Sequence, residues 1–358
     1  MPVLPSSNAP LSVERNMNAR ALLPTHKPLL DFFRNAHATF QSSGGGSSTR
    51  FRVICTLTPR PRDGGPAQLL RHRILADPTP SPPRSRPSRL VVLDSSFNPP
   101  TAAHLRMATE AVLLAGRSEA GGGATRLLLL LAVNNADKAA KPAAFEERLA
   151  LMWAFARDVP TALEQEGREG GDGVAIDVAL SMQPLFHEKS EAIAAADFYK
   201  GEGEGGEAVD GDGQTEQVVL AGYDTLIRIF DPKYYESPDE RAEGSSAGVT
   251  PIQRALDPFF KRARLRVTLR TDAEWGGKDE QTGYIESILH GDALEKIGGS
   301  KEWAGRIETV EGRKESETVV SSTLAREAAK GQDWKRLEGL VSPEVKKWVE
   351  REKLYADA

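Results

Sequence analysis

The chain has few of the residues that several protein classes require. Among its 358 residues there is one cysteine, Cys55, which excludes an internal disulfide and the paired cysteines of a zinc site. The longest strongly apolar run, residues 127–133, is far shorter than the roughly 20 residues that a membrane-spanning helix needs. The amino-terminal segment also lacks the apolar core of a secretory signal. We therefore expect a soluble intracellular protein, cytoplasmic or nuclear, with no membrane partner.

The charge and the missing motifs exclude further classes. The formal net charge is -5 at pH 7, whereas nucleic-acid backbones attract basic surfaces, so we expect no nucleic-acid partner. The sequence contains neither the G-x-x-x-x-G-K-[ST] phosphate loop nor the G-x-S-x-G nucleophile elbow. Gly201, Gly203 and Gly206 do match G-x-G-x-x-G. We reject this match because it follows no predicted strand and stands among glutamates, which would repel a pyrophosphate.

Composition divides the chain into parts of different character. The first part is rich in Ser, Asn, Pro and Arg without large apolar clusters, and we expect it to be disordered. A proline-rich linker separates an amino-terminal extension, with one predicted helix (29–40) and one predicted strand (51–57), from the main domain. We expect this extension to lie at a sheet edge. The predicted boundaries are 1–25, 26–75 for the extension, 76–88 for the linker and 89–358 for the main domain, with mobile insertions near 201–216 and 237–248.

The main domain alternates strand patterns with helix patterns. Fully apolar runs at 90–93, 127–133 and 218–221 predict strands buried on both faces, whereas the strict alternation over 174–180 predicts a strand with one exposed face. Strand, helix and strand repeated in this way imply a parallel sheet with right-handed crossovers and with ligands at the carboxyl ends of its strands. Further strands are predicted over 264–270 and 306–310, and helices over 105–115, 145–156, 226–230, 284–297, 321–330, 334–340 and from 342 onward.

The segment 89–107 contains the strongest functional signal. A buried strand ends in Asp94-Ser95-Ser96-Phe97-Asn98, two prolines follow, and a helix begins at once. Thr101 and His104 are three residues apart, so they share a face of the first helical turn. Free N–H groups and the helix dipole attract anions there, which outlines a phosphate site. A histidine near a helix start has a second interpretation, namely a structural hydrogen bond.

A second anion-attracting helix start lies at residues 320–326. Ser321, Ser322 and Thr323 place hydroxyls at the first turn, and Arg326 adds a planar charged fork one turn later. Ordinary helix capping explains the same residues equally well when this motif is taken alone.

Both segments resemble one family, the nicotinamide mononucleotide adenylyltransferases of the nucleotidylyltransferase superfamily. Residues 95–99 match the family's G-S-F-N-P, Thr101-Ala102-Ala103-His104 matches H/T-x-x-H, and residues 320–326 match I-S-S-T-x-x-R. The chain is identified as a divergent, fungal-type member. Ser95 replaces the usual glycine, which requires that the backbone at this position does not need a positive φ.

The resemblance implies the fold, the reaction and the residues of the site. It implies an α/β, Rossmann-like doubly wound parallel sheet with helices on both faces, to which this chain adds its amino-terminal helix-strand extension and a carboxyl-terminal helical tail. The implied catalytic residues are His104, Arg326 and Thr101, with His104 stabilising the charge on the departing pyrophosphate. The implied ATP-binding residues are Ser95, Ser96, Phe97, His104, Ser321, Ser322, Thr323 and Arg326, with the backbone of Ser96 and Phe97 lining the nucleotide cleft.

Three weaker segments complete the implied mononucleotide site. Gly222-Tyr223-Asp224 resembles the family's G-x-D, whose aspartate binds a ribose, although an aspartate at this position also caps helices. Residues 134–138 resemble a polar loop that approaches the mononucleotide, and a solvated loop is the alternative. Residues 182–190 lie where the family keeps an aromatic side chain that stacks on the pyridine ring, and Phe186 is the candidate there, although the family's tryptophan-glutamate pair is missing. The implied mononucleotide-binding residues are Asn134, Lys138, Gly222, Asp224 and Phe186.

The reaction implied is the transfer of AMP from ATP to nicotinamide mononucleotide, giving NAD and pyrophosphate by direct in-line displacement. Mg2+ is expected to arrive with ATP, since no carboxylate cluster is evident to hold it. Two alternatives stay open at this point: another acceptor, such as nicotinate mononucleotide or another phosphorylated small molecule, and a degenerate nucleotide-binding regulatory protein. The sequence predicts small nucleotides as partners and does not determine the oligomeric state.

Overall fold

The structure is a computed structural model that describes most of the main domain and part of the extension. The described residues are 26–43, 50–58, 78–117, 124–134, 143–166, 173–201, 214–235, 248–269, 277–312 and 318–356. The segment 1–25, which we predicted to be disordered, lies outside these residues, as does most of both predicted insertions.

A seven-stranded sheet forms the centre of the molecule. Its strand order is β1-β4-β3-β2-β5-β6-β7, and every neighbouring pair is parallel except β1 with β4. The chain order reverses between β2 and β5, which makes this a doubly wound, Rossmann-like sheet, as predicted. β1 lies at the edge, where the extension was expected. The strands are β1 (Phe51–Leu57), β2 (Arg89–Asp94), β3 (Thr125–Ala132), β4 (Ala175–Ser181), β5 (Glu216–Gly222), β6 (Ala263–Leu269) and β7 (Ile307–Glu311).

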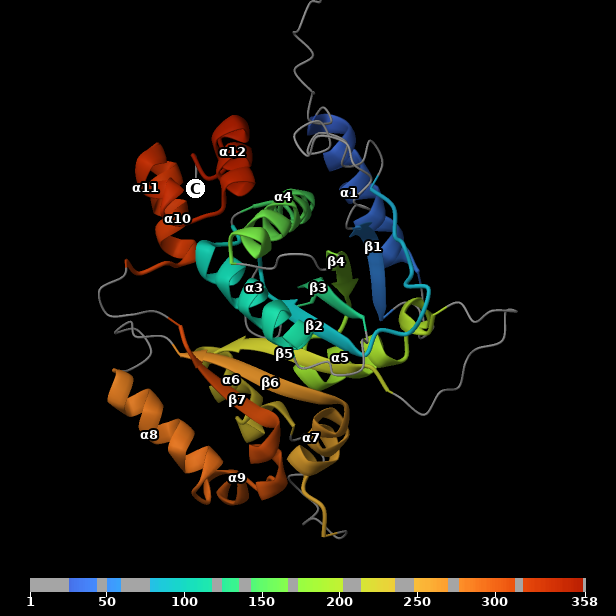
Figure 1. Ribbon diagram of the computed structural model, residues 1–358, viewed down its shortest axis with the longest axis vertical. Coiled ribbons are helices and arrows are strands. Elements are labelled where there is room, and N and C mark those ends of the chain that lie inside the picture. Colours follow the sequence, from blue (N-terminus) through green and yellow to red (C-terminus); the bar gives the residue numbers. More distant parts are fainter. Residues whose placement is uncertain are drawn as a thin grey trace, which may run out of the picture.

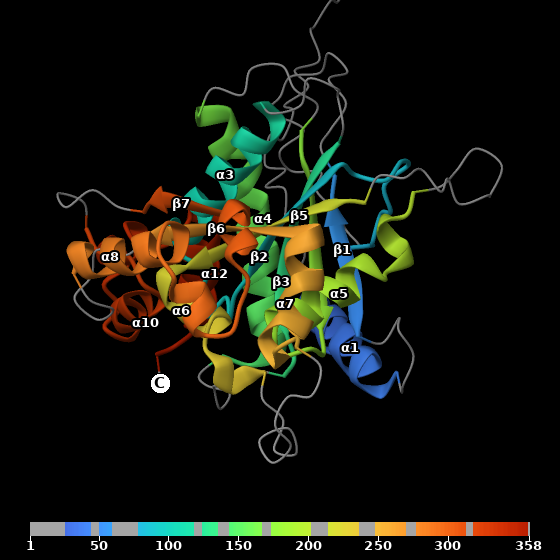
Figure 2. The same ribbon diagram turned by 90° about the horizontal axis from the view of Figure 1, so that it is seen from below.

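Helices cover both faces of the sheet (Figure 1). On one face lie α1 (His26–Ser42), α3 (Ala102–Arg117), α4 (Phe145–Gln165), and the tail helices α10 (Ser322–Lys330), α11 (Trp334–Glu338) and α12 (Pro343–Glu352). Figure 2 looks from below onto the other group, α5 (Phe186–Ala194), α6 (Tyr223–Ile229), α7 (Pro251–Arg262) and α8 (Lys278–Leu289), with α9 (Ala293–Lys296) beside them in Figure 1. Alternate residues of β2 enter the two cores: Val91 and Leu93 one, Leu90 and Val92 the other.

The predicted exposed face of β4 is wrong. Asp177 and Ser181 stand at the polar positions of the alternating pattern, and both have 0% exposure. The Asp177 carboxylate is paired with Arg126 on β3, with Nη2–Oδ1 at 2.6 Å and Nε–Oδ2 at 2.9 Å. Hydroxyls of Thr56 and Tyr199 also donate to it, at 2.7 and 3.1 Å. These donors allow the aspartate to be buried. The sequence pattern shows the polar residue but not its donors, so it predicted exposure to solvent.

Two predicted helices differ from those observed. The helix predicted over 145–156 continues through Pro160 to Gln165. Pro160 removes one backbone hydrogen bond, but Val159 and Leu163 continue the buried face of the helix and hold it against the core. The single helix predicted over 284–297 begins earlier and is divided into α8 and α9. The break falls at Gly291, whose N–H donates to the Glu286 carbonyl at 3.2 Å.

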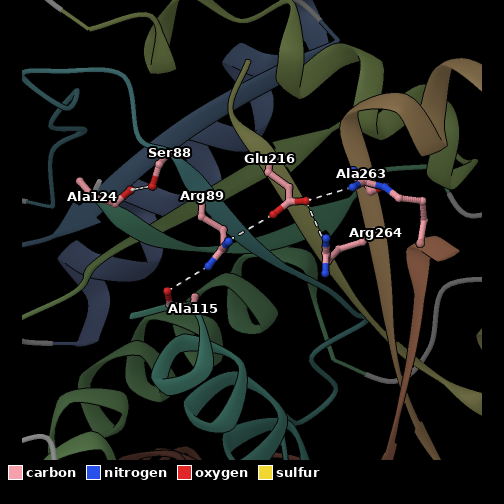
Figure 3. Close-up of polar contacts among 8 residues, drawn as sticks. Ser88, Arg89, Ala115, Ala124, Glu216, Ala263 and Arg264 are labelled. Carbon is pink, nitrogen blue, oxygen red and sulfur yellow. Dashed lines mark hydrogen bonds and ion pairs between the residues drawn. The ribbon is translucent and has the colours of Figure 1, made fainter. Parts of the chain in front are cut away.

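The amino-terminal ends of β2, β5 and β6 are joined by one carboxylate (Figure 3). Glu216 at the start of β5 accepts Nε of Arg89 at 3.2 Å and Nε of Arg264 at 3.0 Å, and Nη1 of Arg306 lies 3.3 Å away. Arg89 also donates to the Ala115 carbonyl at 2.9 Å, which attaches the end of α3. Burial raises the pKa of Glu216, but the three guanidinium groups outweigh burial, and the net pKa is lowered.

Candidate active site

A cavity of about 390 Å3 lies at the carboxyl ends of β2, β5 and β6, against the first turns of α3. β2 and β5 are the strands between which the chain order reverses, and open α/β sheets bind their ligands at this position. The end of β7 and the segment 318–320 before α10 complete the wall. Polar side chains in the wall include Asp94, Ser95, His104, Arg106, Glu110 and Asp224.

His104 is held through both ring nitrogens. The backbone N–H of Thr101 donates to its Nδ1 at 3.0 Å, and the Thr101 hydroxyl lies 2.7 Å from the same atom. A backbone N–H can only donate, so Nδ1 is the unprotonated nitrogen and the proton of the neutral ring is assigned to Nε2. Nε2 lies 3.0 Å from Ser95 Oγ and donates to it. The imidazole therefore stands in one orientation at the cavity wall.

Thr101 is brought together with His104, as the motif predicted, but in a supporting position. Its side chain is 1% exposed and is not part of the cavity wall. Its backbone N–H and hydroxyl both face His104 Nδ1, and its carbonyl accepts the Leu105 N–H at 3.1 Å at the start of α3. Thr101 thus fixes the ring and opens the helix.

The segment 95–98 has its special backbone geometry at Phe97 and not at Ser95. Phe97 has φ 47, whereas Ser95 does not have a positive φ, which meets the condition for a side chain at that position. The Phe97 ring is fully buried, 6.4 Å between centroids from Phe155. Ser96 is exposed, and its carbonyl accepts Arg148 Nε at 2.7 Å. Neither Ser96 nor Phe97 contributes to the cavity wall described above.

The start of α10 is attached to the same segment. Ser321 caps the helix by accepting the Leu324 N–H at 3.2 Å, and the Ser322 hydroxyl donates to the Pro99 carbonyl at 2.8 Å. Arg326 donates from Nη1 to the Asn98 carbonyl at 2.8 Å and from Nη2 to the Thr323 hydroxyl at 3.1 Å.

None of these four α10 side chains is part of the cavity wall, which instead includes residues 318–320 just before them. The structure shows the capping interpretation at Ser321, and the anion-binding interpretation stays a prediction. Ser321 is a helix cap, and the motif as a whole lies against the β2–α3 connection.

The carboxyl-terminal segment also reaches this connection. The Tyr355 hydroxyl donates to Asn98 Oδ1 at 2.9 Å, and both side chains are buried. Burial raises the pKa of Tyr355, so its hydroxyl stays protonated and remains a donor. No sequence motif indicated this contact, since it joins residues at opposite ends of the main domain.

Gly222 and Asp224, the two fixed residues of the G-x-D motif, both lie in the cavity wall, and their contact with a mononucleotide stays a prediction. Gly222 has φ -82, which any residue can adopt, so the reason for glycine is space. A Cβ at this position would lie 2.6 Å from Asp224 Oδ1. Glycine therefore leaves the carboxylate free to keep its present direction.

The other predicted mononucleotide residues lie elsewhere. Asn134 is exposed at the end of β3 and donates from Nδ2 to the Met182 carbonyl at 3.0 Å. Phe186 begins α5, with the Lys189 Nζ 5.0 Å from its ring centroid. Neither side chain is part of the cavity wall. Lys138 lies outside the described residues.

Two features of the wall were missed in the sequence. Asp94 pairs with Lys189 on α5, with Oδ2–Nζ at 2.5 Å, and their side chains are only 7% and 9% exposed. The pair joins β2 to a helix far along the chain, so no local pattern predicts it. Arg106 stands two residues after His104 and brings a permanent positive charge to the wall. Its place in the first turns of a phosphate-attracting helix was the available signal.

The described ranges contain neither a metal cage nor a membrane span. No group of three or more His, Cys, Asp or Glu side chains there is placed to hold a metal ion. No helix of the described chain combines the length and hydropathy of a membrane span.

Comparisons with known proteins identify the family. No family model matches the chain. Over 239 residues it is 32% identical to a protein of Schizosaccharomyces pombe named "Putative nicotinamide mononucleotide adenylyltransferase", and the match covers 67% of this chain and 75% of the yeast protein.

Two solved structures are similar at a lower level. One is a Plasmodium falciparum nicotinic acid mononucleotide adenylyltransferase complexed with APC, with 10% identity and a TM-score of 0.37 over 75% of this chain and 98% of that chain. The other is Thermotoga maritima TmcAL bound with alpha-thio ATP, with 15% identity and a TM-score of 0.30 over 74% of this chain and 56% of that chain. TM-scores this low establish no shared fold, and the assignment rests on the yeast relative. By that relationship the chain belongs to the nicotinamide mononucleotide adenylyltransferase family and is a nucleotidyltransferase.

Proposed function

We propose that this enzyme transfers AMP from ATP to nicotinamide mononucleotide and releases NAD and pyrophosphate. The observation that carries the proposal is the cavity at the switch point of the sheet, with His104 in its wall at the first turn of α3. The name of the yeast relative supports this acceptor.

The ATP phosphates are proposed to lie against the first turn of α3. The helix dipole attracts anions there, and Arg106 adds a positive charge, although the Ala102 N–H already donates to the Leu340 carbonyl at 2.9 Å. His104 stabilises the charge that develops on the departing pyrophosphate, while Thr101 holds its ring. We extend the ATP site to Ser96, to the Phe97 backbone, and to Ser321, Ser322, Thr323 and Arg326. For Arg326 this requires that its N–H groups, which now donate to the Asn98 carbonyl and the Thr323 hydroxyl, donate to phosphate oxygens instead.

The acceptor is proposed to lie across β5. The Asp224 carboxylate accepts hydrogen bonds from a ribose hydroxyl, and Gly222 leaves space for that carboxylate. Asn134, Lys138 and Phe186 remain predicted contacts of the mononucleotide. For Phe186 this role requires movement of its ring away from Lys189.

The chemistry proposed is direct attack of the acceptor's phosphate oxygen on the α-phosphorus of ATP. Such a displacement needs no covalent enzyme intermediate, so the protein contributes alignment and charge neutralisation. Asp94 in the wall is already neutralised by Lys189, and the described residues offer no cage for a metal. We therefore assign Mg2+ to the substrate, as MgATP, where it neutralises phosphate charge.

The acceptor is tested with a panel. Purified full-length chain is given MgATP with nicotinamide mononucleotide, nicotinate mononucleotide or another phosphorylated small molecule, and dinucleotide products are separated and quantified. The proposal expects the highest kcat/KM for nicotinamide mononucleotide. A higher value for another acceptor keeps the adenylyltransferase and replaces the substrate. Tight ATP binding without any product would favour the nucleotide-binding regulatory alternative.

The role of His104 is tested by His104→Ala. Removing one preorganised donor to developing charge typically costs about 100- to 1,000-fold in kcat, whereas KM for the mononucleotide is expected to change little. His290→Ala is the matched control, because His290 is exposed at the end of α8, and α8 lies on the other face of the sheet from α3. Equal losses in kcat and in mononucleotide affinity would contradict a role in the transition state.

A further inference from the structure

Ser95 departs from the family motif at a position that contacts His104. Where the motif has glycine, this chain places a hydroxyl 3.0 Å from His104 Nε2. The backbone still runs beside β3 at this point, since the Ser95 N–H donates to the Leu130 carbonyl at 3.3 Å. Strand pairing and the ring contact together fix the position of Oγ at the cavity wall.

The direction of the hydrogen bonds follows from Thr101. The Thr101 backbone N–H donates to His104 Nδ1, so Nδ1 carries no proton. The neutral ring therefore donates from Nε2 to Ser95 Oγ. A serine hydroxyl that accepts this bond keeps its own proton for another acceptor. Each accepted bond polarises the next donor in such a chain. The Ser95 O–H is therefore the outer end of a chain that starts at the Thr101 backbone.

The surroundings favour an anion as the acceptor. Asp94, the residue before Ser95, carries its charge next to Lys189 at 2.5 Å, so its carboxylate is neutralised. Arg106 brings positive charge to the same wall. The wall also contains Glu311 and two carboxylates with an arginine nearby: Glu110 Oε2 lies 4.0 Å from Arg266 Nη2, and Asp224 Oδ2 lies 4.0 Å from Arg228 Nη1.

We propose that the Ser95 hydroxyl itself donates to a phosphate oxygen of the bound nucleotide, with His104 acting on the phosphate through Ser95. This inference rests on the proposed function, and it gives Ser95, which the family resemblance implied only as an ATP-binding residue, a specific contact through its hydroxyl. Ser95 is then a catalytic residue, and His104 is in part a positioning residue for the hydroxyl. No proton is transferred in this arrangement, because each link of the chain is a hydrogen bond.

The test is a double-mutant cycle on the full-length enzyme with kcat and KM for MgATP. Ser95→Ala is expected to lower kcat/KM about 10- to 100-fold, the range for losing a hydrogen bond to a charged group, mostly through kcat. In a His104→Ala background the same change is expected to cost less than about threefold, because the chain is already broken. Ser95→Thr keeps a hydroxyl and should restore activity relative to Ser95→Ala. Ser88→Ala, at the other end of β2, is the matched control.

The outcomes separate the two proposals. If the native enzyme forms no NAD, the proposed function is wrong, and the relay through Ser95, which rests on it, falls with it. If the native enzyme is active and the two substitutions multiply independently, the relay through Ser95 is wrong. Activity that rises in Ser95→Ala would also overturn it, because the hydroxyl would then be shielding His104 from the nucleotide. If Ser95→Ala lowers the unfolding temperature, the kinetic comparison uses Ser95→Gly instead, because this variant lacks the same hydroxyl.

Discussion

Asp158 lies where α4 meets α12, and its substitution gives the sharpest stability prediction. Both carboxylate oxygens face the Glu344 N–H in the first turn of α12, at 3.0 and 3.3 Å. Burial is the main cause that raises the pKa of Asp158 from 3.8 to about 6, although the bond from the Glu344 N–H and the charge of Lys347 oppose it. The Glu344 carboxylate raises it further.

The sign follows from proton linkage. Between about pH 4 and 6 the folded protein holds a proton on Asp158 that the unfolded chain has lost, so stability falls as pH rises through this window. The difference of about 2 pKa units corresponds to roughly 3 kcal/mol above pH 6. Asp158→Asn keeps an acceptor for the Glu344 N–H and removes the buried charge. Its melting temperature should match that of the native protein near pH 4 and exceed it by about 5 °C at pH 7.5.

The assay is thermal unfolding followed by circular dichroism from pH 4 to 8. Asp333→Asn is the matched control, since Asp333 caps α11 in the same way, by accepting the Arg336 N–H at 3.0 Å, but is exposed. The control should differ from the native protein by the same amount at every pH. The reasoning is refuted if Asp158→Asn gains nothing between pH 4 and 7.5, or if its gain is already present at pH 4.

Three further predictions concern the cavity and the sheet. Gly222→Ala should displace the Asp224 carboxylate and raise KM for the mononucleotide with little change in melting temperature, as steady-state kinetics would show; an unchanged KM contradicts the ribose contact. Tyr355→Phe removes the hydrogen bond that the Tyr355 hydroxyl donates to the buried Asn98 Oδ1, so calorimetry should find a loss of about 0.5 to 1.5 kcal/mol together with lower turnover. Glu216→Gln should cost about 2 kcal/mol at pH 7. Because the pKa of Glu216 is lowered in the folded state, that contribution is lost as pH falls below the ordinary glutamate range, and a variant that stays equally destabilised at pH 3.5 would contradict it.

Local patterns predicted most of the sheet. The apolar runs at β2, β3 and β5 could be recognised because a strand buried on both faces has no polar residue to obscure it. β4 was misjudged because Asp177 is neutralised by Arg126 on another strand, and no local pattern reports such a partner. The helix predicted over 145–156 was too short, because α4 continues through Pro160, where packing against the core outweighs the one missing hydrogen bond.

In the candidate site, too, local contacts were predictable from the sequence and tertiary contacts were not. Thr101 and His104 were predictable because they lie three residues apart on one helix, and their contact is local. The present contacts of Arg326 were not predictable, since they depend on Asn98, which only the tertiary fold brings near. The hydroxyl of Ser95 was read as a departure from a motif, and its contact with His104 became visible only once β2 and α3 were placed together.

The central claim is adenylyl transfer to nicotinamide mononucleotide in the cavity beside His104. The most direct measurement follows the products formed by the purified full-length chain from MgATP and this acceptor. NAD and pyrophosphate should appear in equal amounts and with equal rates, and both should fall together in His104→Ala while the His290→Ala control keeps the native rate. A folded protein that binds ATP and releases neither product, or that releases pyrophosphate without NAD, would contradict the account.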